Sequence, residues 1–242
     1  MNHPLSENAN MQPVGSAFIS RMFVVLAILA LCSLAIFAVG KVFGRSIALG
    51  GHTHDTRAHE IVIGNNVLKV PANAIRDNRQ RRSGLTNRLD LYGTWPELHG
   101  YTHERAADFN HLDGSRKIIF LSFHERHMLR DMSARFDPIY RQLIVEPGIA
   151  GPQGLTLFGF NNKAGYLDEL LAVGSRPGTT PFAARCLAGE AAERSLSPCE
   201  RDVHVGDGLT LTYRFPKELL SEWRALDARV LDLSDRLIQR VN

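Results

Sequence analysis

The chain has 242 residues, of which 28 are lysine or arginine and 25 are aspartate or glutamate, giving a formal net charge of +3 at pH 7. So small an excess of charge indicates neither nucleic acid nor a strongly acidic partner. The part after Gly50 is long enough for one domain with its own hydrophobic core.

An uncharged apolar run, residues 22–40, follows a polar segment that we expect to be a disordered tail over residues 1–21. About 20 apolar residues cross a bilayer core of about 30 Å, whereas a buried helix of a soluble protein normally carries a polar stripe. We therefore predict one transmembrane helix over residues 22–43, with the lipid bilayer as its partner. The anchoring positions include Met22, Val25, Leu29, Leu34 and Phe37.

Two alternatives for this run stay open. Residues 38–40 (AVG) resemble the small-residue cleavage site of a signal peptide, although the run is long for one. Residues 29–32 (LALC) resemble a lipoprotein signal ending at Cys32, but Leu31 occupies a position where a small residue is expected.

Two signals conflict over the side of the membrane on which the rest of the chain lies. Basic residues are more frequent after the run than before it, which favours a cytoplasmic location. Cys186 and Cys199 flank a polar loop with a proline, which is typical of a disulfide in an oxidising compartment; two unrelated buried thiols are the alternative. We give the cysteines more weight and predict a single-pass protein of the cytoplasmic (inner) membrane with its C-terminal domain in the periplasm.

Residues 44–59 resemble a juxtamembrane linker that contains three histidines, His52, His54 and His59. Imidazole and carboxylate groups bind Zn²⁺ or Cu²⁺. A stable site usually needs a further ligand from a second element, and the sequence does not identify one. We therefore expect a polar linker, with no metal and no cofactor.

The folded domain is expected over residues 60–242. We expect it to begin with a hairpin around residues 64–66 (GNN), because asparagine and glycine suit a tight turn. For residues 76–98 we expect an arginine-rich loop that ends in a short helix or a docked segment. The arginines of this loop either meet anionic lipid headgroups or are simply solvated. They are Arg76, Arg79, Arg81, Arg82 and Arg88.

Residues 117–123 (KIIFLSF) are predicted to form a central buried strand, followed by a helix over residues 124–136 and a further strand over residues 139–145. His124, Glu125 and His127 lie where the central strand gives way to the helix. Their spacing differs from the zinc-protease motif HExxH. The end of a central strand is nevertheless a common place for function, so these three residues are the candidate catalytic groups.

Strands are also expected near residues 155–160 and 167–173, with a helix as the alternative for the second, and residues 182–187 lead into the first cysteine. The clearest strand is residues 209–215, in which apolar and polar side chains alternate. The turn at residues 206–208 (GDG) predicts that it pairs with residues 202–205.

The last segment is predicted to be an amphipathic helix that begins near Pro216. Its apolar residues recur at spacings of four and three, and its charged residues, Asp227 among them, are expected on the wet face or beside the seam. We favour packing of this seam on the domain's own sheet, with a homodimer as the alternative. The seam residues are Leu219, Trp223, Leu226, Val230, Leu233 and Leu237.

Four stretches carry a resemblance: EIVIGNNVLKVPANAIR, KIIFLSF, LTLFGF and ARCLAG…PCERDVHVGDGLTLTYRF. With these, the chain resembles a group of uncharacterised single-pass, membrane-anchored envelope proteins of alphaproteobacteria. The resemblance implies an anchored extracytoplasmic domain with no known activity, so it assigns no functional residue.

We expect an α+β fold: one transmembrane helix, then one mostly antiparallel β-rich domain closed by a C-terminal amphipathic helix. The sequence contains no P-loop, GxGxxG, GxSxG or CxxC motif. The favoured hypothesis is therefore a non-enzymatic periplasmic binding or scaffold protein whose ligand is an unknown envelope protein or glycan. One alternative is an anchored periplasmic hydrolase, with or without an assisting metal ion, that uses His124, Glu125 or His127. The other is a secretion-system accessory or immunity protein.

Overall fold

The computed structural model describes residues 16–48, 51–110 and 117–239. The chain consists of two compact units, Met1–Gly50 and Gly51–Asn242. Most of the tail that we expect to be disordered, residues 1–15, lies outside the described residues. The second unit includes residues 51–59, which the sequence assigns to a linker.

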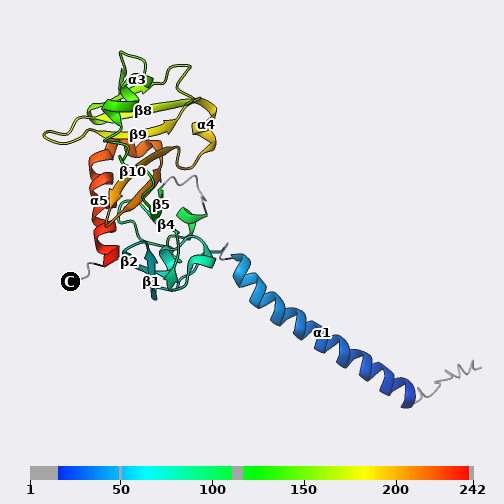
Figure 1. Cartoon of the computed structure of the whole chain (residues 1–242). Helices are drawn as coiled ribbons and strands as arrows, with labels where there is room; N and C mark the ends of the chain where they lie inside the picture. Colours follow the sequence, from blue (N-terminus) through cyan, green and yellow to red (C-terminus); the bar gives the residue numbers. More distant parts are fainter. Residues whose placement is uncertain (1–15, 49–50, 111–116, 240–242) are drawn as a thin grey trace, which may run out of the picture. The chain divides into compact units, whose positions relative to one another are not determined.

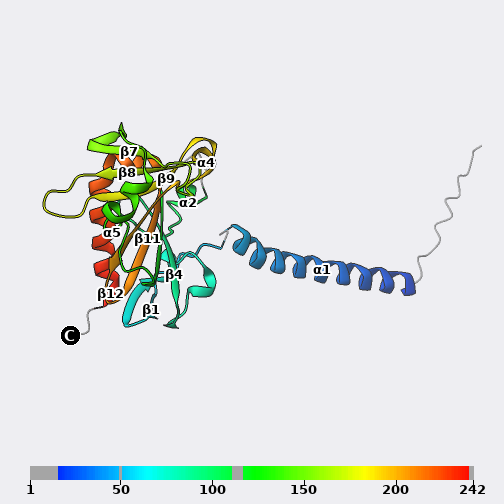
Figure 2. The ribbon, with the colours of Figure 1, turned by 45° about the horizontal axis from the view of Figure 1, so that its top comes forward.

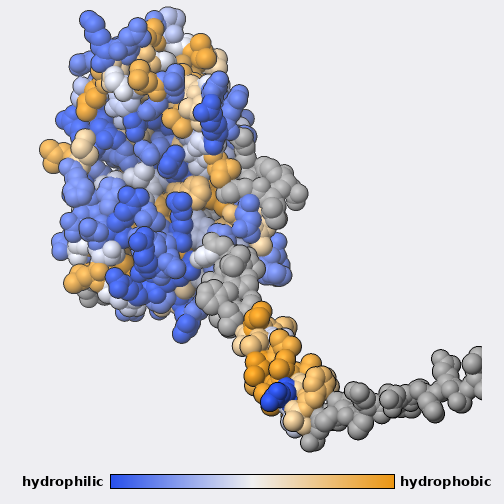
Figure 3. Space-filling model, turned by 90° about the vertical axis from the view of Figure 1, so that its right-hand side faces the viewer, coloured by the Kyte–Doolittle hydropathy of each residue, from blue (hydrophilic) through white to orange (hydrophobic). Residues whose placement is uncertain are grey.

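Helix α1, Ser16–Ala48, is the described part of the first unit. Its stretch Ser20–Phe37 is long and apolar enough to cross a membrane, and none of it is buried. Apolar side chains dominate the face of the helix seen in Figure 3, and those with the largest exposed fractions include Phe23, Ile36 and Phe37. A membrane anchor and a signal sequence both have these properties.

The second unit is built around β-strands. In chain order they are β1 (Ala58–Ile63), β2 (Asn66–Pro71), β3 (Gly84–Leu85), β4 (Arg88–Thr94), β5 (Ile118–Glu125), β6 (Ile149–Ala150), β7 (Leu155–Gly159), β8 (Glu169–Gly174), β9 (Phe182–Leu187), β10 (Cys199–Val205), β11 (Leu209–Phe215) and β12 (Ile238–Gln239). The helices are the short α2 (Ala106–Phe109), α3 (Arg141–Leu143) and α4 (Gly189–Arg194), and the longer α5 (Trp223–Leu237).

Among the described residues the strands form two sheets. The large sheet has the order β4-β5-β11-β10-β9-β8-β7-β6 and is antiparallel throughout. The small sheet has the order β12-β2-β1-β3, in which only the β1–β3 pair is parallel. Helix α5 lies alongside the strands of the large sheet in both ribbon views (Figures 1 and 2). The predicted mixture of helix and sheet, the large antiparallel sheet and the C-terminal helix are therefore confirmed.

The hydrophobic core lies between one face of the large sheet, the small sheet and α5. Every second residue of β11 contributes to it, namely Leu209, Leu211, Tyr213 and Phe215, and each of these side chains is fully buried. This confirms the strand and the face that the alternation predicts. The β10–β11 hairpin is confirmed as well, because Val205 pairs with Leu209 around the glycine-containing turn.

The apolar seam of the C-terminal helix packs into this same core. Leu219, Trp223, Leu226, Val230 and Leu237 are buried there, and Leu233 is half-buried against it. The seam is thus covered by the domain's own sheets, which is the first of the two arrangements considered above. Of the two positions expected for Asp227, the wet face is wrong and the place beside the seam is the one observed, since this residue is 2% exposed and lies on the buried side of α5.

Two further expectations from the sequence are wrong. No α-helix forms over residues 124–136, because His124 and Glu125 continue β5 by pairing with Thr210 and Leu209 of β11. Residues 139–145 are not a strand; a π-helical turn, Phe136–Tyr140, leads there into α3. The apolar spacing that predicted a helix instead serves a second, smaller core, in which Met132, Phe136 and Tyr140 cover part of the sheet's other face.

Residues 88–94, expected to be helical or a docked loop, form β4. Leu89 and Leu91 alternate into the core, and β4 pairs with β5 along its whole length. The polar residues that alternate with them, Arg88 and Asp90, mask this pattern in the sequence because they lie within an arginine-rich stretch.

The predicted disulfide is present between Cys186 and Cys199, which are directly paired residues of β9 and β10. Both cysteines are almost completely buried. The bond closes a loop that contains α4, at a sequence separation of 13 residues.

Asp227 is the centre of a buried cluster of charged groups. Its Oδ1 accepts hydrogen bonds from Arg201 Nε at 2.9 Å and Tyr213 Oη at 2.5 Å, and its Oδ2 accepts one from Arg176 Nη2 at 2.5 Å. Arg201 also donates from Nη1 to Ser133 Oγ at 2.8 Å and to the Ala183 carbonyl at 2.9 Å. One carboxylate thereby joins α5 to β10, β11 and the segment after β8.

Burial raises the pKa of Asp227, but Arg201, Tyr213 and Arg176 together have the larger effect and hold this pKa below the ordinary value of 3.8. The pKa of the Tyr213 phenol is raised well above 10, chiefly by burial. A carboxylate with a lowered pKa stabilises the fold at pH values above its ordinary pKa. That stabilisation is lost as the pH falls through the lowered value.

Removal of the disulfide should destabilise the second unit. We expect the Cys186→Ala/Cys199→Ala variant of the full chain in detergent to lose about 2–4 kcal/mol of unfolding free energy, because a cross-link restricts the unfolded chain. Urea denaturation followed by tryptophan fluorescence measures the loss. Cys32→Ala, in α1, is the matched control and should leave the unfolding midpoint unchanged. Rapid labelling of two thiols besides Cys32 in the native, unreduced chain would contradict the bond.

Loss of the charge at the centre of the cluster should lower the unfolding free energy by more than removal of the disulfide does. Asp227→Asn leaves Arg201 buried without a counter-charge, so we expect a loss of about 3–5 kcal/mol. Asp232→Asn, on the same helix but in an exposed ion pair with Arg236, should cost less than about 0.5 kcal/mol. Urea denaturation as a function of pH should also show a steeper acid limb for the wild type than for Asp227→Asn below pH 3.8. Equal stability of the two variants would refute the central role of this carboxylate.

Candidate binding groove beside α5

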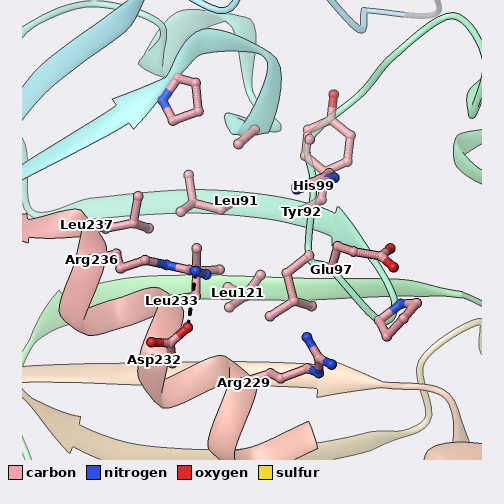
Figure 4. A pocket seen from close by; sticks show the side chains of 15 residues that line it. Leu91, Tyr92, Glu97, His99, Leu121, Arg229, Asp232, Leu233, Arg236 and Leu237 are labelled. Atoms are coloured by element: carbon pink, nitrogen blue, oxygen red, sulfur yellow. Dashed lines mark ion pairs between the residues drawn. The ribbon is translucent and has the colours of Figure 1, made fainter.

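A cavity of about 440 Å³ lies where the C-terminal half of α5 passes β4 and β5 (Figure 4). We call it the α5 groove. It has the size of a small-molecule or side-chain binding pocket. Its lining comprises Pro71, Ala74, Leu91, Tyr92, Pro96, Glu97, Leu98, His99, Gly100, Leu121, Arg229, Asp232, Leu233, Arg236 and Leu237.

The floor of the α5 groove is apolar. Leu91 of β4 and Leu121 of β5 reach it from the core face of the large sheet. Leu233 and Leu237 reach it from α5, where a spacing of four residues places both on one side of the helix. All four belong to the main core or pack against it, so the floor is held rigidly.

The segment after β4 forms one lip of the groove by folding back on that strand. The Leu98 amide donates to the Thr94 carbonyl at 2.8 Å, and the Thr94 amide donates to the His99 carbonyl at 3.0 Å. Gly93 permits the close approach, because a Cβ there would lie 2.6 Å from the Leu98 carbonyl oxygen. Leu98 itself has a φ of 57° and is buried.

Charged side chains surround the opening, and most of them are paired. Arg236 forms an ion pair with Asp232 at 3.2 Å, drawn as a dashed line in Figure 4. Glu97 accepts from Arg105 at 3.1 Å, and this guanidinium lowers the pKa of the Glu97 carboxyl. Arg229 lies over the Trp95 ring at 5.9 Å. Within the described residues it has no carboxylate partner, so its positive charge is available to an acidic group that enters the opening.

Two of the three candidate catalytic residues, His124 and His127, lie outside the α5 groove, on the face of the large sheet opposite the core. The rings of His124 and His127 are stacked at 6.1 Å, and both line a hollow of about 260 Å³. Glu125 does not join them, because consecutive strand residues point to opposite faces. Its side chain lies instead beside the Gly64 turn. The structure thus brings together the two histidines but not the carboxylate.

The three histidines of the expected linker do not form one cluster: two of them contact one tyrosine ring and the third lies in a strand. His52 stacks on Tyr101 at 4.6 Å and its Nδ1 lies 3.0 Å from the Tyr92 hydroxyl. His54 contacts the same Tyr101 ring, whereas His59 lies in β1. Among the described residues, no group of three or more histidine, cysteine, aspartate or glutamate side chains is arranged to hold a metal ion.

Neither a protein-family model nor a curated protein matches this sequence. Among solved structures, Smlt3025, an immunity protein of the Stenotrophomonas maltophilia type IV secretion system, is similar with a TM-score of 0.51 and 14% identity. The match covers 78% of this chain and 96% of that one. The iron-regulated outer membrane lipoprotein FrpD of Neisseria meningitidis matches with a TM-score of 0.44, 10% identity and coverages of 77% and 94%. At this identity the first similarity shows a shared fold and nothing more.

Sequence reasoning identified only two residues of the α5 groove, Leu233 and Leu237, and assigned them to the helix seam. Arg229 is one of the charged residues that the sequence places on the wet face of this helix or beside its seam. A signal for the groove does exist: the cluster WPELHG at residues 95–100 contains a proline and a glycine directly after a strand that ends in the core. What the sequence does not contain is the partner of that loop, because α5 lies more than a hundred residues further along the chain.

Proposed function

We propose that this chain is a membrane-anchored binding protein of the cell envelope, whose folded unit binds a protein partner through the α5 groove. The observation that carries the proposal is the apolar floor of the groove beside the Arg229 guanidinium, which no described carboxylate neutralises. Protein interfaces gain most of their free energy from a few apolar and arginine contacts in pockets of this kind. An apolar side chain next to an acidic one in the partner would complement the groove.

In this proposal α1 is a single anchor in the cytoplasmic membrane and the folded unit lies in the periplasm. The exposed apolar stretch Ser20–Phe37 supports the anchor. The Cys186–Cys199 bond supports the compartment, since disulfides persist in oxidising environments. Retention of the uncut N-terminus in the membrane fraction distinguishes an anchor from a cleaved signal sequence.

A secretion-system immunity protein is the second candidate, within the same class of binding proteins. The shared fold extends over 96% of Smlt3025, which is an immunity protein of a type IV secretion system. Immunity requires tight binding of a toxin rather than catalysis, and a rigid groove suits that task. A hydrolase has less support from the geometry, because Glu125 lies on the opposite side of β5 from His124 and His127 and does not converge with them.

The groove can be tested by photo-crosslinking in cells. A photoreactive amino acid at Asp232, on the rim of the groove, should form one discrete protein adduct. The same amino acid at Lys217, which does not line the groove, should not. After identification by mass spectrometry, the purified partner should bind the full chain in detergent. Arg229→Glu should weaken that binding at least roughly tenfold, because it places like charges in contact.

Arg224→Glu is the matched control for charge, since it lies on the same helix outside the groove and should change the affinity less than roughly twofold. Equal loss in both variants, or equal adducts from both crosslinker positions, would refute the groove as the contact site. The immunity candidate predicts in addition that cells lacking the chain are killed by wild-type siblings. The wild-type chain should restore their survival, and the Arg229→Glu variant should not.

A further inference from the structure

The open face of the large sheet contains a second hollow, of about 360 Å³, on the opposite side of β4 and β5 from the α5 groove. Strand register places its side chains on one face: Asp90 pairs with Ser122, and Ser122 pairs with Thr212. Likewise Arg88 pairs with His124. The polar residues that neighbouring strands present here are therefore fixed by backbone pairing and not by flexible loops.

Three arginines from three elements converge on this hollow: Arg76 from the segment after β2, Arg88 from β4 and Arg214 from β11. Arg88 is neutralised by Asp90 at 2.9 Å. Arg76 has its guanidinium over the Phe120 ring at 4.8 Å, and in the described part of the chain neither it nor Arg214 has a carboxylate partner. Two uncompensated guanidiniums therefore remain.

Glu200, the cross-strand neighbour of Arg214, forms an ion pair with another arginine, which it shares with Glu169. That arginine is Arg185, and its distance from Glu200 is 3.1 Å. The hollow therefore has a net positive charge even though two carboxylates line it. An arrangement of this kind attracts a negatively charged group from solution.

The Ser122 hydroxyl gives an independent indication. Its Oγ is buried and has no hydrogen-bond partner within the described residues. A buried polar atom without a partner is rare and costs free energy, so it commonly marks the place of an ion, a water molecule or a ligand. Ser122 lines the hollow between the strands that contribute Arg88 and Arg214, and rotation about its Cα–Cβ bond would bring the hydroxyl to a ligand oxygen there.

We propose that this hollow binds an oxyanion, a phosphate or a carboxylate group of a small molecule, between the Arg76 and Arg214 guanidiniums with the Ser122 hydroxyl as a further donor. Guanidinium groups form short, charge-assisted hydrogen bonds with both kinds of oxyanion. The volume exceeds that of a bare phosphate, so the anionic group is attached to a larger body such as an acidic or phosphorylated sugar. The site is separate from the α5 groove and does not rest on the function proposed for that groove.

The test is isothermal titration calorimetry on the full chain in an uncharged detergent, at constant ionic strength. Inorganic phosphate and succinate are the two probes, and the tighter of them identifies the preferred oxyanion. We expect saturable binding of at least one probe. Arg214→Gln and Arg76→Gln should each weaken it by roughly tenfold, because each removes a charge-assisted hydrogen bond. Both side chains are exposed, so neither change should affect folding.

Two controls separate the site from a general effect of charge. Arg224→Gln removes one positive charge outside the hollow and should leave the affinity unchanged. Ser122→Ala should weaken binding severalfold while leaving the urea unfolding midpoint unchanged or higher, since it removes an unpaired buried hydroxyl. The proposal is overturned if neither probe binds saturably, if Arg224→Gln weakens binding as much as Arg214→Gln, or if Arg214→Gln and Arg76→Gln bind like the wild type.

Discussion

The carboxylate of Asp227 is the constraint on which the arrangement of the second unit depends. A seam of leucines would let a helix slide or rotate on a sheet at little cost, because apolar contacts are not directional. A buried charge must meet its partners in one geometry, since leaving it unpaired is strongly unfavourable. Asp227 meets Arg201, Tyr213 and Arg176 at once, so α5 has a single register in which all of these bonds form.

The same cluster explains how the large sheet stays continuous where two of its strands separate. β9 and β10 are paired only at Cys186–Cys199 and Arg185–Glu200. Beyond these pairs, Arg201 extends to the Ala183 carbonyl of β9 and to the Ser133 hydroxyl. A guanidinium with several donors in one plane can replace strand-to-strand hydrogen bonds that the diverging backbones no longer make. The disulfide closes one end of this gap and the ion cluster fills the other.

Much of the fold was predictable because the signals were local. The alternation in β11, the glycine turns and the spacing of the two cysteines each depend on residues close in sequence.

Asp227 was not predictable, because an aspartate on a helix is normally solvated and its three partners come from three other segments. The helix expected from His124 onward failed for a related reason: pairing of Thr210 with His124 extends β5, and this long-range contact outweighs the helical spacing. Among the candidate catalytic residues, strand geometry separates Glu125 from the histidines that precede and follow it.

Both binding sites proposed for the molecule arise where the chain protects an edge of the large sheet. β4 is an edge strand, and unpaired edge strands favour aggregation. Two segments cover it: the Arg76 amide donates to the Asp90 carbonyl, and residues 95–100 fold back so that His99 accepts from the Thr94 amide. The first contact positions Arg76 over Phe120, beside the proposed oxyanion hollow. The second forms the lip of the α5 groove.

The backbone bonds that protect the edge therefore also pre-organise both sites, which lowers the ordering cost of binding a ligand. For this reason the edge of the sheet offers two rigid concave surfaces, and one of them extends along β5 to His124, at the strand end that the sequence favoured.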